Sequence, residues 1–267
     1  MIHQMFIAKS GMFAYQRAMN SITNNISNAQ TVGFKKSRVE FESLFPLIQE
    51  KAISEFEELQ VPTSEKRRKY ITYGQGVRIA DVTKDFNQGT IEITNQPLDL
   101  AIEGQGFFQV RLPDGTVAFT RAGNLHQDVE GNVVNPNGHP LEPAIRIPRN
   151  TTEVVIDSEG RVLVRINNEA TPREIGQVVL ANFSNSEGLK ELGQTLYLDT
   201  VASGEPVLGT PGRESYGNIR QRALEFSNVN IVEEMVRMLL TQRGFELIVK
   251  SFSVGDKMMT TASEIAR

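Results

Sequence analysis

Both ends of this chain carry apolar residues in alternating steps of three and four, which restricts each end to a long helix with one apolar face. The N-terminal seam consists of Met5, Ala8, Met12, Tyr15, Met19, Ile22, Ile26 and Ala29. A heptad pattern sustained over more than three repeats is typical of a coiled coil. The N-terminal helix is therefore expected to need an apolar partner.

A second seam near the C-terminus supplies such a partner. It consists of Ile231, Met235, Met238, Gln242, Phe245, Val249, Phe252, Asp256 and Met259. Asn230 stands at the expected N-cap of the second helix, and Glu233 three residues later completes a pattern like a capping box. We predict an antiparallel helix pair. Its seam residues are Met5, Met12, Tyr15, Met19, Ile22 and Ile26 on one side and Met235, Met238, Phe245, Val249 and Phe252 on the other.

The middle of the chain changes to short β-branched and aromatic runs separated by turn residues. Residues 106–112 and 116–119 flank a Pro-Asp-Gly turn, which predicts a hairpin. A second hairpin is predicted to join 154–156 to 161–164, and 175–183 adds a further strand. The middle is expected to be an all-β domain.

The predicted fold class is therefore α+β, with N- and C-terminal helices forming a coiled coil and a central all-β domain. The predicted ranges are 1–38 for the first helix and its turn, 39–76 for an extended connector, 77–227 for the β domain and 228–267 for the second helix. The basic run at 65–69 lies beside acidic residues and is interpreted as a solvated loop of the connector, in preference to a site for nucleic acid or acidic lipid.

The composition argues against several classes of function. The chain has 28 Lys and Arg against 32 Asp and Glu, so charge gives no reason to expect nucleic acid. Cysteine is absent, which excludes disulfides and thiolate chemistry. No apolar run approaches the roughly 18 residues of a membrane span, and the first ten residues lack the order of a signal peptide. These features indicate a cytoplasmic protein, unless the chain leaves by a route that cleaves nothing.

Catalytic chemistry finds little support in the sequence. His3, His126 and His139 match no metal-ligand spacing, and the last two stand among turn formers, so we assign no metal. The Gly-Gln-Gly at 104–106 precedes a strand and not a helix, so we interpret it as a tight turn and not as a phosphate cradle. We predict no catalytic residue and no cofactor.

Four stretches give the chain a resemblance to a known family. They are 23–28 (TNNISN) running to 31–36 (TVGFKK), 98–108 (LDLAIEGQGFF), 119–123 (FTRAG), and 227–230 (SNVN) followed by 233–236 (EEMV) and 242–243 (QR). In content and in order they resemble the flagellar rod and hook proteins. The resemblance covers nearly the whole chain.

The resemblance implies a structural subunit that is exported without cleavage through the flagellar export apparatus. It implies a helical homopolymer in the basal-body rod across the periplasm, with other rod subunits, hook protein and basal-body ring proteins as partners. Neither nucleic-acid binding nor membrane insertion is implied. Length and the SNVN-EEMV stretch favour the distal type of rod subunit, and the proximal rod subunit is the alternative.

Asparagines suggest where the polymer contacts lie. Asn20, Asn24 and Asn28 recur every four residues opposite the helix seam. The alternative is an ordinary solvated face, but charge serves solubility better than amides, and asparagine is a mediocre helix former. The predicted polymer-interface residues are Asn20, Asn24, Asn25, Asn28, Asn228 and Asn230.

Two further points stay open in the sequence. Gly244 and Gly255 interrupt the second helix, where each costs about 1 kcal/mol against alanine. They either weaken the helix or allow close approach of a neighbouring helix. A function of another class, a ligand-binding β domain oligomerised by its helices, has slight support because the chain has no Trp and few Tyr for a sugar platform.

Overall fold

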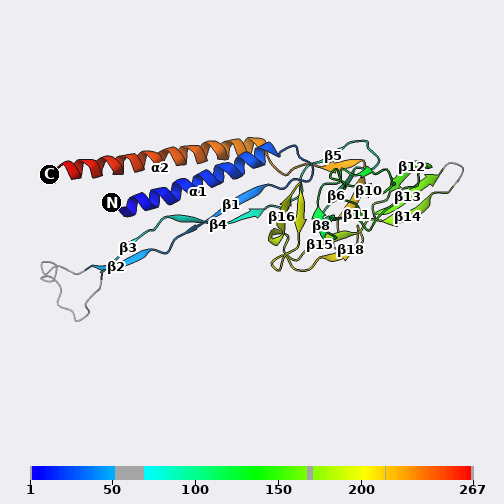
Figure 1. The fold of residues 1–267 in the computed structure, drawn as a ribbon, viewed down its shortest axis with the longest axis horizontal. Helices are drawn as coiled ribbons and strands as arrows, with labels where there is room; N and C mark the ends of the chain where they lie inside the picture. Colours follow the sequence, from blue (N-terminus) through cyan, green and yellow to red (C-terminus); the bar gives the residue numbers. More distant parts are fainter. Residues whose placement is uncertain (1, 52–68, 167–170, 214, 266–267) are drawn as a thin grey trace. The chain divides into compact units, whose positions relative to one another are not determined.

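The computed structural model describes residues 2–51, 69–166, 171–213 and 215–265 (Figure 1). Contacts divide the chain into two units. The first contains Met1–Thr23, Arg38–Thr83 and Met235–Arg267, and the second contains Asn24–Ser37 and Lys84–Glu234. Two terminal helices and many strands make the protein α+β, as predicted. The four predicted domain ranges, 1–38, 39–76, 77–227 and 228–267, remain a prediction.

The helices are α1 (Ile2–Ser27) and α2 (Ile231–Ile265). Helix α2 begins at the predicted N-cap, because the Asn230 Oδ1 accepts hydrogen bonds from the backbone N–H groups of Val232 at 3.1 Å and Glu233 at 3.4 Å. Two glutamates in its first turn complement the helix dipole. Helix α2 continues unbroken through Gly244 and Gly255.

The predicted connector contains strands that the sequence analysis does not anticipate. Strand β1 (Ser37–Ser43) is hydrogen-bonded to β4 (Val77–Lys84). Strand β2 (Leu47–Lys51) pairs antiparallel with β3 (Lys69–Tyr73), with Leu47 opposite Tyr73. Residues 52–68, which include most of the basic run, lie outside the described residues.

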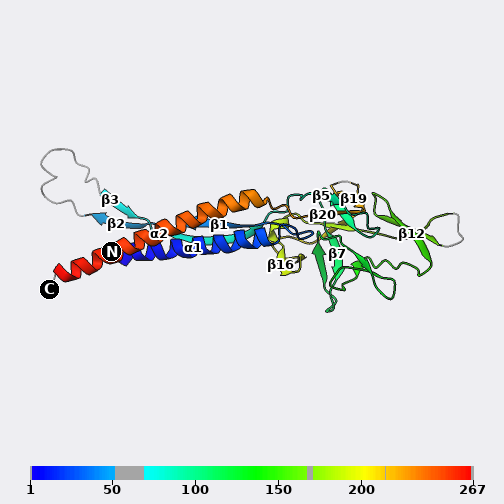
Figure 2. The same cartoon turned by 90° about the horizontal axis from the view of Figure 1, so that it is seen from above.

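The second unit is built almost entirely of short strands, seen in turned view in Figure 2. They are β5 (Ile91–Ile93), β6 (Leu100–Glu103), β7 (Phe108–Arg111), β8 (Val117–Thr120), β9 (His126–Gln127), β10 (Val133–Val134), β11 (Leu141–Glu142), β12 (Thr151–Ile156), β13 (Arg161–Ile166), β14 (Arg173–Gln177), β15 (Leu180–Asn182), β16 (Lys190–Gly193), β17 (Leu196–Leu198), β18 (Val207–Gly209), β19 (Asn218–Gln221) and β20 (Ala223–Glu225). A 3-10 turn, η2 (Ser186–Gly188), precedes β16.

The largest sheet has five strands in the order β11-β7-β8-β17-β16, and a second sheet has the order β12-β13-β14. The predicted hairpins are confirmed as β7-β8 and β12-β13, both antiparallel. The predicted strand at 175–183 is wrong as a single element. Strand β14 pairs with β13, whereas β15 pairs with β18 in another sheet. Gly104 and Gly106 adopt φ values of 121° and 132° between β6 and β7, which fits the predicted tight turn.

Two apolar clusters hold the strands together. The larger one includes Leu100, Ile102 and Val164, each at most 1% exposed. The smaller one is aromatic. The centre of the Phe107 ring lies 5.7 Å from the centre of the Phe183 ring and 6.4 Å from that of the Tyr197 ring, and both pairs meet edge to face. Strand β13 alternates exposed and buried residues, whereas β6, β7 and β8 are buried on both faces.

Candidate assembly surfaces

Within the first unit, α1 and α2 contact each other antiparallel. The Ile248 side chain lies against Gly11, where a Cβ would come within 2.9 Å of its Cδ1. The Tyr15 ring packs on Gly244, where a Cβ would lie 2.7 Å from the ring. Tyr15 is four residues after Gly11 on α1, and Gly244 is four residues before Ile248 on α2, so the two helices run in opposite directions. Gly244 therefore allows close approach of the neighbouring helix in the same chain. Among the described residues, none comes within 4 Å of a Cβ placed on Gly255.

The two glycines give a matched pair of substitutions. We expect Gly255→Ala to stabilise α2 by about 1 kcal/mol through helix propensity. Gly244→Ala is expected to gain nothing or to lose stability, because the methyl group meets the Tyr15 ring. Thermal melts of the full chain followed by far-ultraviolet circular dichroism measure both effects. An equal gain in the two variants would contradict the close packing at Gly244.

Helix α2 turns a regular stripe of less exposed residues inward. The stripe consists of Glu234, Met238, Thr241, Phe245, Ile248, Phe252, Gly255 and Met259, in alternating steps of four and three. It shares Met238, Phe245 and Phe252 with the predicted seam. Met235 and Val249 lie outside it and are 52% and 40% exposed.

The predicted seam residues of α1 all have reduced exposure. Ile22 is buried, and Met5, Met12, Tyr15, Met19 and Ile26 are half-buried. The covered face of α1 is wider than this seam, because Gly11, Ala14 and Asn25 are buried as well. Helix α1 has a second neighbour in the first unit, since the Ser10 Oγ accepts a 3.4 Å hydrogen bond from the backbone N–H of Val77 in β4.

Outside its inward stripe, α2 exposes large apolar side chains. Val232, Leu239, Leu240 and Leu247 are each more than 60% exposed. Others are Ile231, Met235, Val236, Val249, Val254, Met258 and Ile265. So many exposed apolar residues along one helix are typical of a surface that contacts another molecule.

Three of the predicted interface asparagines are engaged inside the chain. Asn25 is 1% exposed, and its amide donates to the Ser37 carbonyl and to Glu234 at 3.1 Å. Asn228 accepts from the backbone N–H of Lys36 and donates to the Asp85 carbonyl. Asn230 is the N-cap of α2. These amides orient the segments that enter and leave the second unit.

Of the other three asparagines, Asn20 and Asn24 lie on α1, and Asn28 follows its last residue. Asn20 and Asn24 are exposed and Asn28 is half-buried. The Asn28 amide donates to the Asn24 carbonyl oxygen at 2.9 Å and to its side-chain Oδ1 at 2.7 Å. The Thr31 hydroxyl donates in turn to the Asn28 Oδ1 at 3.2 Å. The end of α1 thus presents an ordered row of amides.

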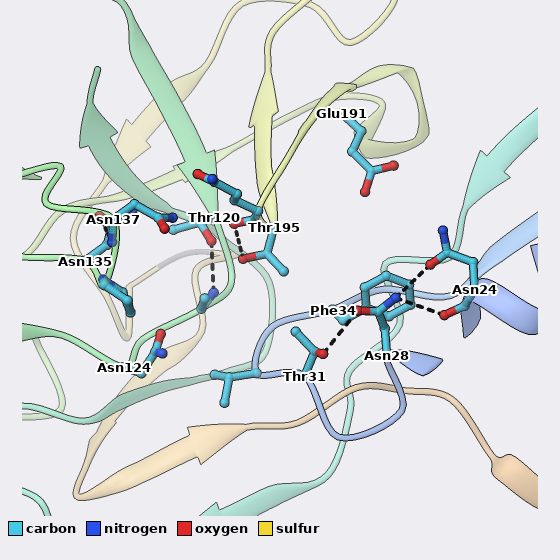
Figure 3. Close-up of a pocket in the computed structure, with 14 residues that line it drawn as sticks. Asn24, Asn28, Thr31, Phe34, Thr120, Asn124, Asn135, Asn137, Glu191 and Thr195 are labelled. Atoms are coloured by element: carbon cyan, nitrogen blue, oxygen red, sulfur yellow. Dashed lines mark hydrogen bonds between the residues drawn. The ribbon is translucent and has the colours of Figure 1, made fainter. Parts of the chain in front are cut away.

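Asn24 and Asn28 form one wall of an open cleft in the second unit (Figure 3). Thr31 and Phe34 continue that wall, and side chains from β8, from the β10-β11 turn and from the β16-β17 turn face it. The facing residues include Thr120, Asn124, Asn135, Asn137, Glu191, Gln194 and Thr195. Amides and hydroxyls dominate, so the cleft suits hydrogen bonding to a polar segment.

Electrostatically the cleft is close to neutral. Glu191 pairs with the Lys84 ammonium at 3.0 Å. The same ammonium lies 4.7 Å from the centre of the Phe34 ring, a cation–π contact that holds the ring at the wall.

A buried ion cluster fixes the turn that follows α1. The Lys35 Nζ lies 2.7 Å from the Glu225 Oε1, and both side chains are fully buried. The Arg121 Nη1 lies 3.4 Å from the other oxygen of Glu225. Burial lowers the pKa of Lys35, and Glu225 opposes that effect by stabilising the ammonium. The Glu225 Oε1 also accepts from the backbone N–H of Gly89.

This cluster is the feature that sequence reasoning missed. Its three charged residues belong to stretches that the resemblance singled out or adjoined, but charge alone does not predict burial. The Lys35 ammonium also donates to the Asn87 carbonyl at 2.7 Å, and the Arg121 guanidinium lies 5.2 Å from the centre of the Phe107 ring. The cluster therefore attaches 24–37, and with it the amide wall, to the β strands.

In the described parts of the chain, no three potential metal ligands among His, Asp and Glu gather closely enough to hold an ion. Neither helix, over its described residues, combines the length and apolar character of a membrane span.

Three family models match the chain in order. The model described as flagella basal body rod protein matches residues 5–35, the flagellar hook protein FlgE/F/G D1 domain matches 101–164, and the flagellar basal body rod FlgEFG protein C-terminal model matches 220–265. The matched ranges cover α1, part of the β strands, and α2.

Several curated proteins are similar over nearly the full length. The flagellar basal-body rod protein FlgG of Buchnera aphidicola subsp. Acyrthosiphon pisum is 40% identical over 266 residues, which is 99% of this chain and 100% of the relative. FlgG of Caulobacter vibrioides is 38% identical over 260 residues, 97% of both chains. The flagellar basal-body rod protein FlgF of Mesorhizobium japonicum is 30% identical over 91% of this chain and 88% of the relative.

Proposed function

Because this chain belongs to the flagellar basal-body rod protein family, in which its relatives at 36 to 40% identity are named FlgG, we propose that it forms the distal rod as a helical homopolymer. Membership makes it a structural subunit of the basal body that assembles with other rod and hook components, and the family is not one of enzymes. The observation that carries the polymer proposal is the row of exposed apolar side chains on α2.

The finer parts of the proposal concern position and route. We place the subunit in the distal rod, crossing the periplasm and transmitting torque to the hook, after export without a cleaved signal peptide. The proximal position is the alternative, and the higher identity to FlgG proteins than to the FlgF protein supports the distal one. Basal-body ring proteins and the export apparatus are the further proposed partners.

The helix pair is proposed as the packing unit of the polymer. One face of α2 is covered by α1, and the remaining apolar faces are available to helices of neighbouring copies. Antiparallel pairs with heptad stripes pack in this way as coiled coils. A tube of such pairs buries the exposed leucines and valines that an isolated subunit leaves in water.

The amide row is proposed as a polar contact between copies, made by Asn20, Asn24 and Asn28. We expect the double variant Asn24→Ala with Asn28→Ala to fold normally, because alanine improves helix propensity by roughly half a kcal/mol at Asn24, and Asn28 lies in the turn just after α1. Polymer yield is expected to fall, because each amide partner left unsatisfied in a neighbouring copy costs about 1 to 3 kcal/mol.

The test measures secreted subunit, polymer seen by electron microscopy, and swarming. Secretion and the melting temperature of the subunit serve as controls and are expected to match the parent chain. Normal polymers together with normal swarming would mean that the amide row is an ordinary solvated face.

A further inference from the structure

The turn between β16 and β17 has an unusual backbone. Gly193 pairs with Leu196 across a two-residue loop, and both loop residues have positive φ, 55° at Gln194 and 59° at Thr195. A two-residue hairpin of this kind is normally Asn-Gly or Asp-Gly, because the left-handed region disfavours side chains. For a β-branched residue such as Thr195 it is a true outlier.

This turn lies at the cleft described above, opposite the amide wall. Thr195 faces the space across which Asn28 and Thr31 lie (Figure 3). The Thr195 hydroxyl donates to the carbonyl of Gln194 at 2.6 Å, which holds the turn in its shape. Gln194 is exposed and Thr195 is half-buried, so both side chains are accessible from the cleft.

An Asn-Gly turn would hold the same backbone without strain, but it would lack the Gln194 amide and the methyl and hydroxyl groups of Thr195. Strained residues persist where the surrounding structure holds them, and they cluster at functional sites. Here the side chains extend the polar surface of the cleft. We infer that the Gln194–Thr195 turn is a contact element for a loop of a second copy of this chain, which occupies the cleft.

The inference rests on the proposed function, and a second copy is the occupant because the cleft is continuous with the amide row. Asn24 and Asn28 belong both to that row and to the cleft wall. Side-chain amides donate and accept at once, which matches the backbone groups of a protein loop. The cleft's only lining carboxylate among the described residues, Glu191, is paired with Lys84, so no charge selects a small ion.

The test replaces the turn by its relaxed form, Gln194→Asn with Thr195→Gly. The matched control is Arg222→Gly, which relieves a φ of 62° at an exposed residue outside the cleft. Both variants are expected to melt about 2 to 6 °C above the parent chain, because a strained conformation is removed. Differential scanning calorimetry on the full-length subunit measures this.

Polymerisation then separates the two variants. The critical concentration for polymer formation, measured by sedimentation, is expected to rise about tenfold in the turn variant. The lost contact is expected to weaken the association constant between copies by the same factor. The control is expected to polymerise like the parent. A turn variant that polymerises at the parental concentration would overturn the inference.

The amide variant keeps the two proposals apart. If Asn24→Ala with Asn28→Ala impairs assembly and the turn variant does not, only the role of the turn is wrong. If neither impairs assembly, the amide contact fails and this inference fails with it. Impaired assembly in both, with unchanged melting in the first and raised melting in the second, supports the second copy in the cleft.

Discussion

Replacing Glu225 by glutamine is expected to lower the free energy of unfolding of the second unit by about 3 to 5 kcal/mol. The substitution keeps the shape but removes the carboxylate that forms an ion pair with both Lys35 and Arg121. Two buried cations then lose their shared ion-pair partner, which is the costly way to break a buried ion pair. Urea unfolding of the full chain measures the loss.

Glu142→Gln is the matched control, because Glu142 pairs with Arg111 at 3.0 Å on the surface. That pair is well solvated, so its loss is expected to change stability by less than about 1 kcal/mol. Equal losses in the two variants would show that the buried cluster does not hold the second unit together. The Glu225 variant is also expected to loosen 24–37 and so to displace the amide wall of the cleft.

Ile248→Asp is expected to separate the two helices, whereas Val249→Asp is expected to leave them paired. Ile248 lies against Gly11, and a carboxylate there meets an apolar surface without a partner, at a cost of at least about 2 kcal/mol. Val249 is 40% exposed and lies outside the inward stripe, so the same change there should stay within about 0.5 kcal/mol.

Helix content of the isolated subunit, from far-ultraviolet circular dichroism, distinguishes the two. Melting of the second unit is the internal control and is expected to be unchanged in both variants. If Val249→Asp loses as much helix content as Ile248→Asp, then Val249 packs between α1 and α2 as the sequence predicts.

The heptad pattern of α2 shows why the sequence predicts the helix but not its inward face. Leu239, Leu240 and Leu247 are exposed although they are as apolar as Phe245 and Phe252. Helix α2 has apolar residues on more than one face, so its sequence fits two heptad frames that differ by one residue at alternate positions. The frame containing Val249 and the frame containing Ile248 share Phe245 and Phe252, so periodicity alone does not choose.

The hairpins were predictable for a different reason. The turn residues at 113–115 and 157–160 stand between β-branched runs, and local turn chemistry is readable from a single stretch of sequence. The Gln194–Thr195 turn has no such signal, because its residues contradict the conformation that they adopt. The strands at 37–51 carry many charges, and their pairing depends on distant partners.

The ion pair between Lys35 and Glu225 closes a loop of 190 residues. Closing so long a loop has a large entropic cost, which makes it a late step when the chain folds. A chain that emerges with its N-terminus first presents Lys35 and Arg121 long before their shared carboxylate arrives. The β strands between them can form beforehand, but the turn after α1 gains its anchor only when nearly the whole chain is present. Completion of the chain and anchoring of the turn after α1 are thereby coupled.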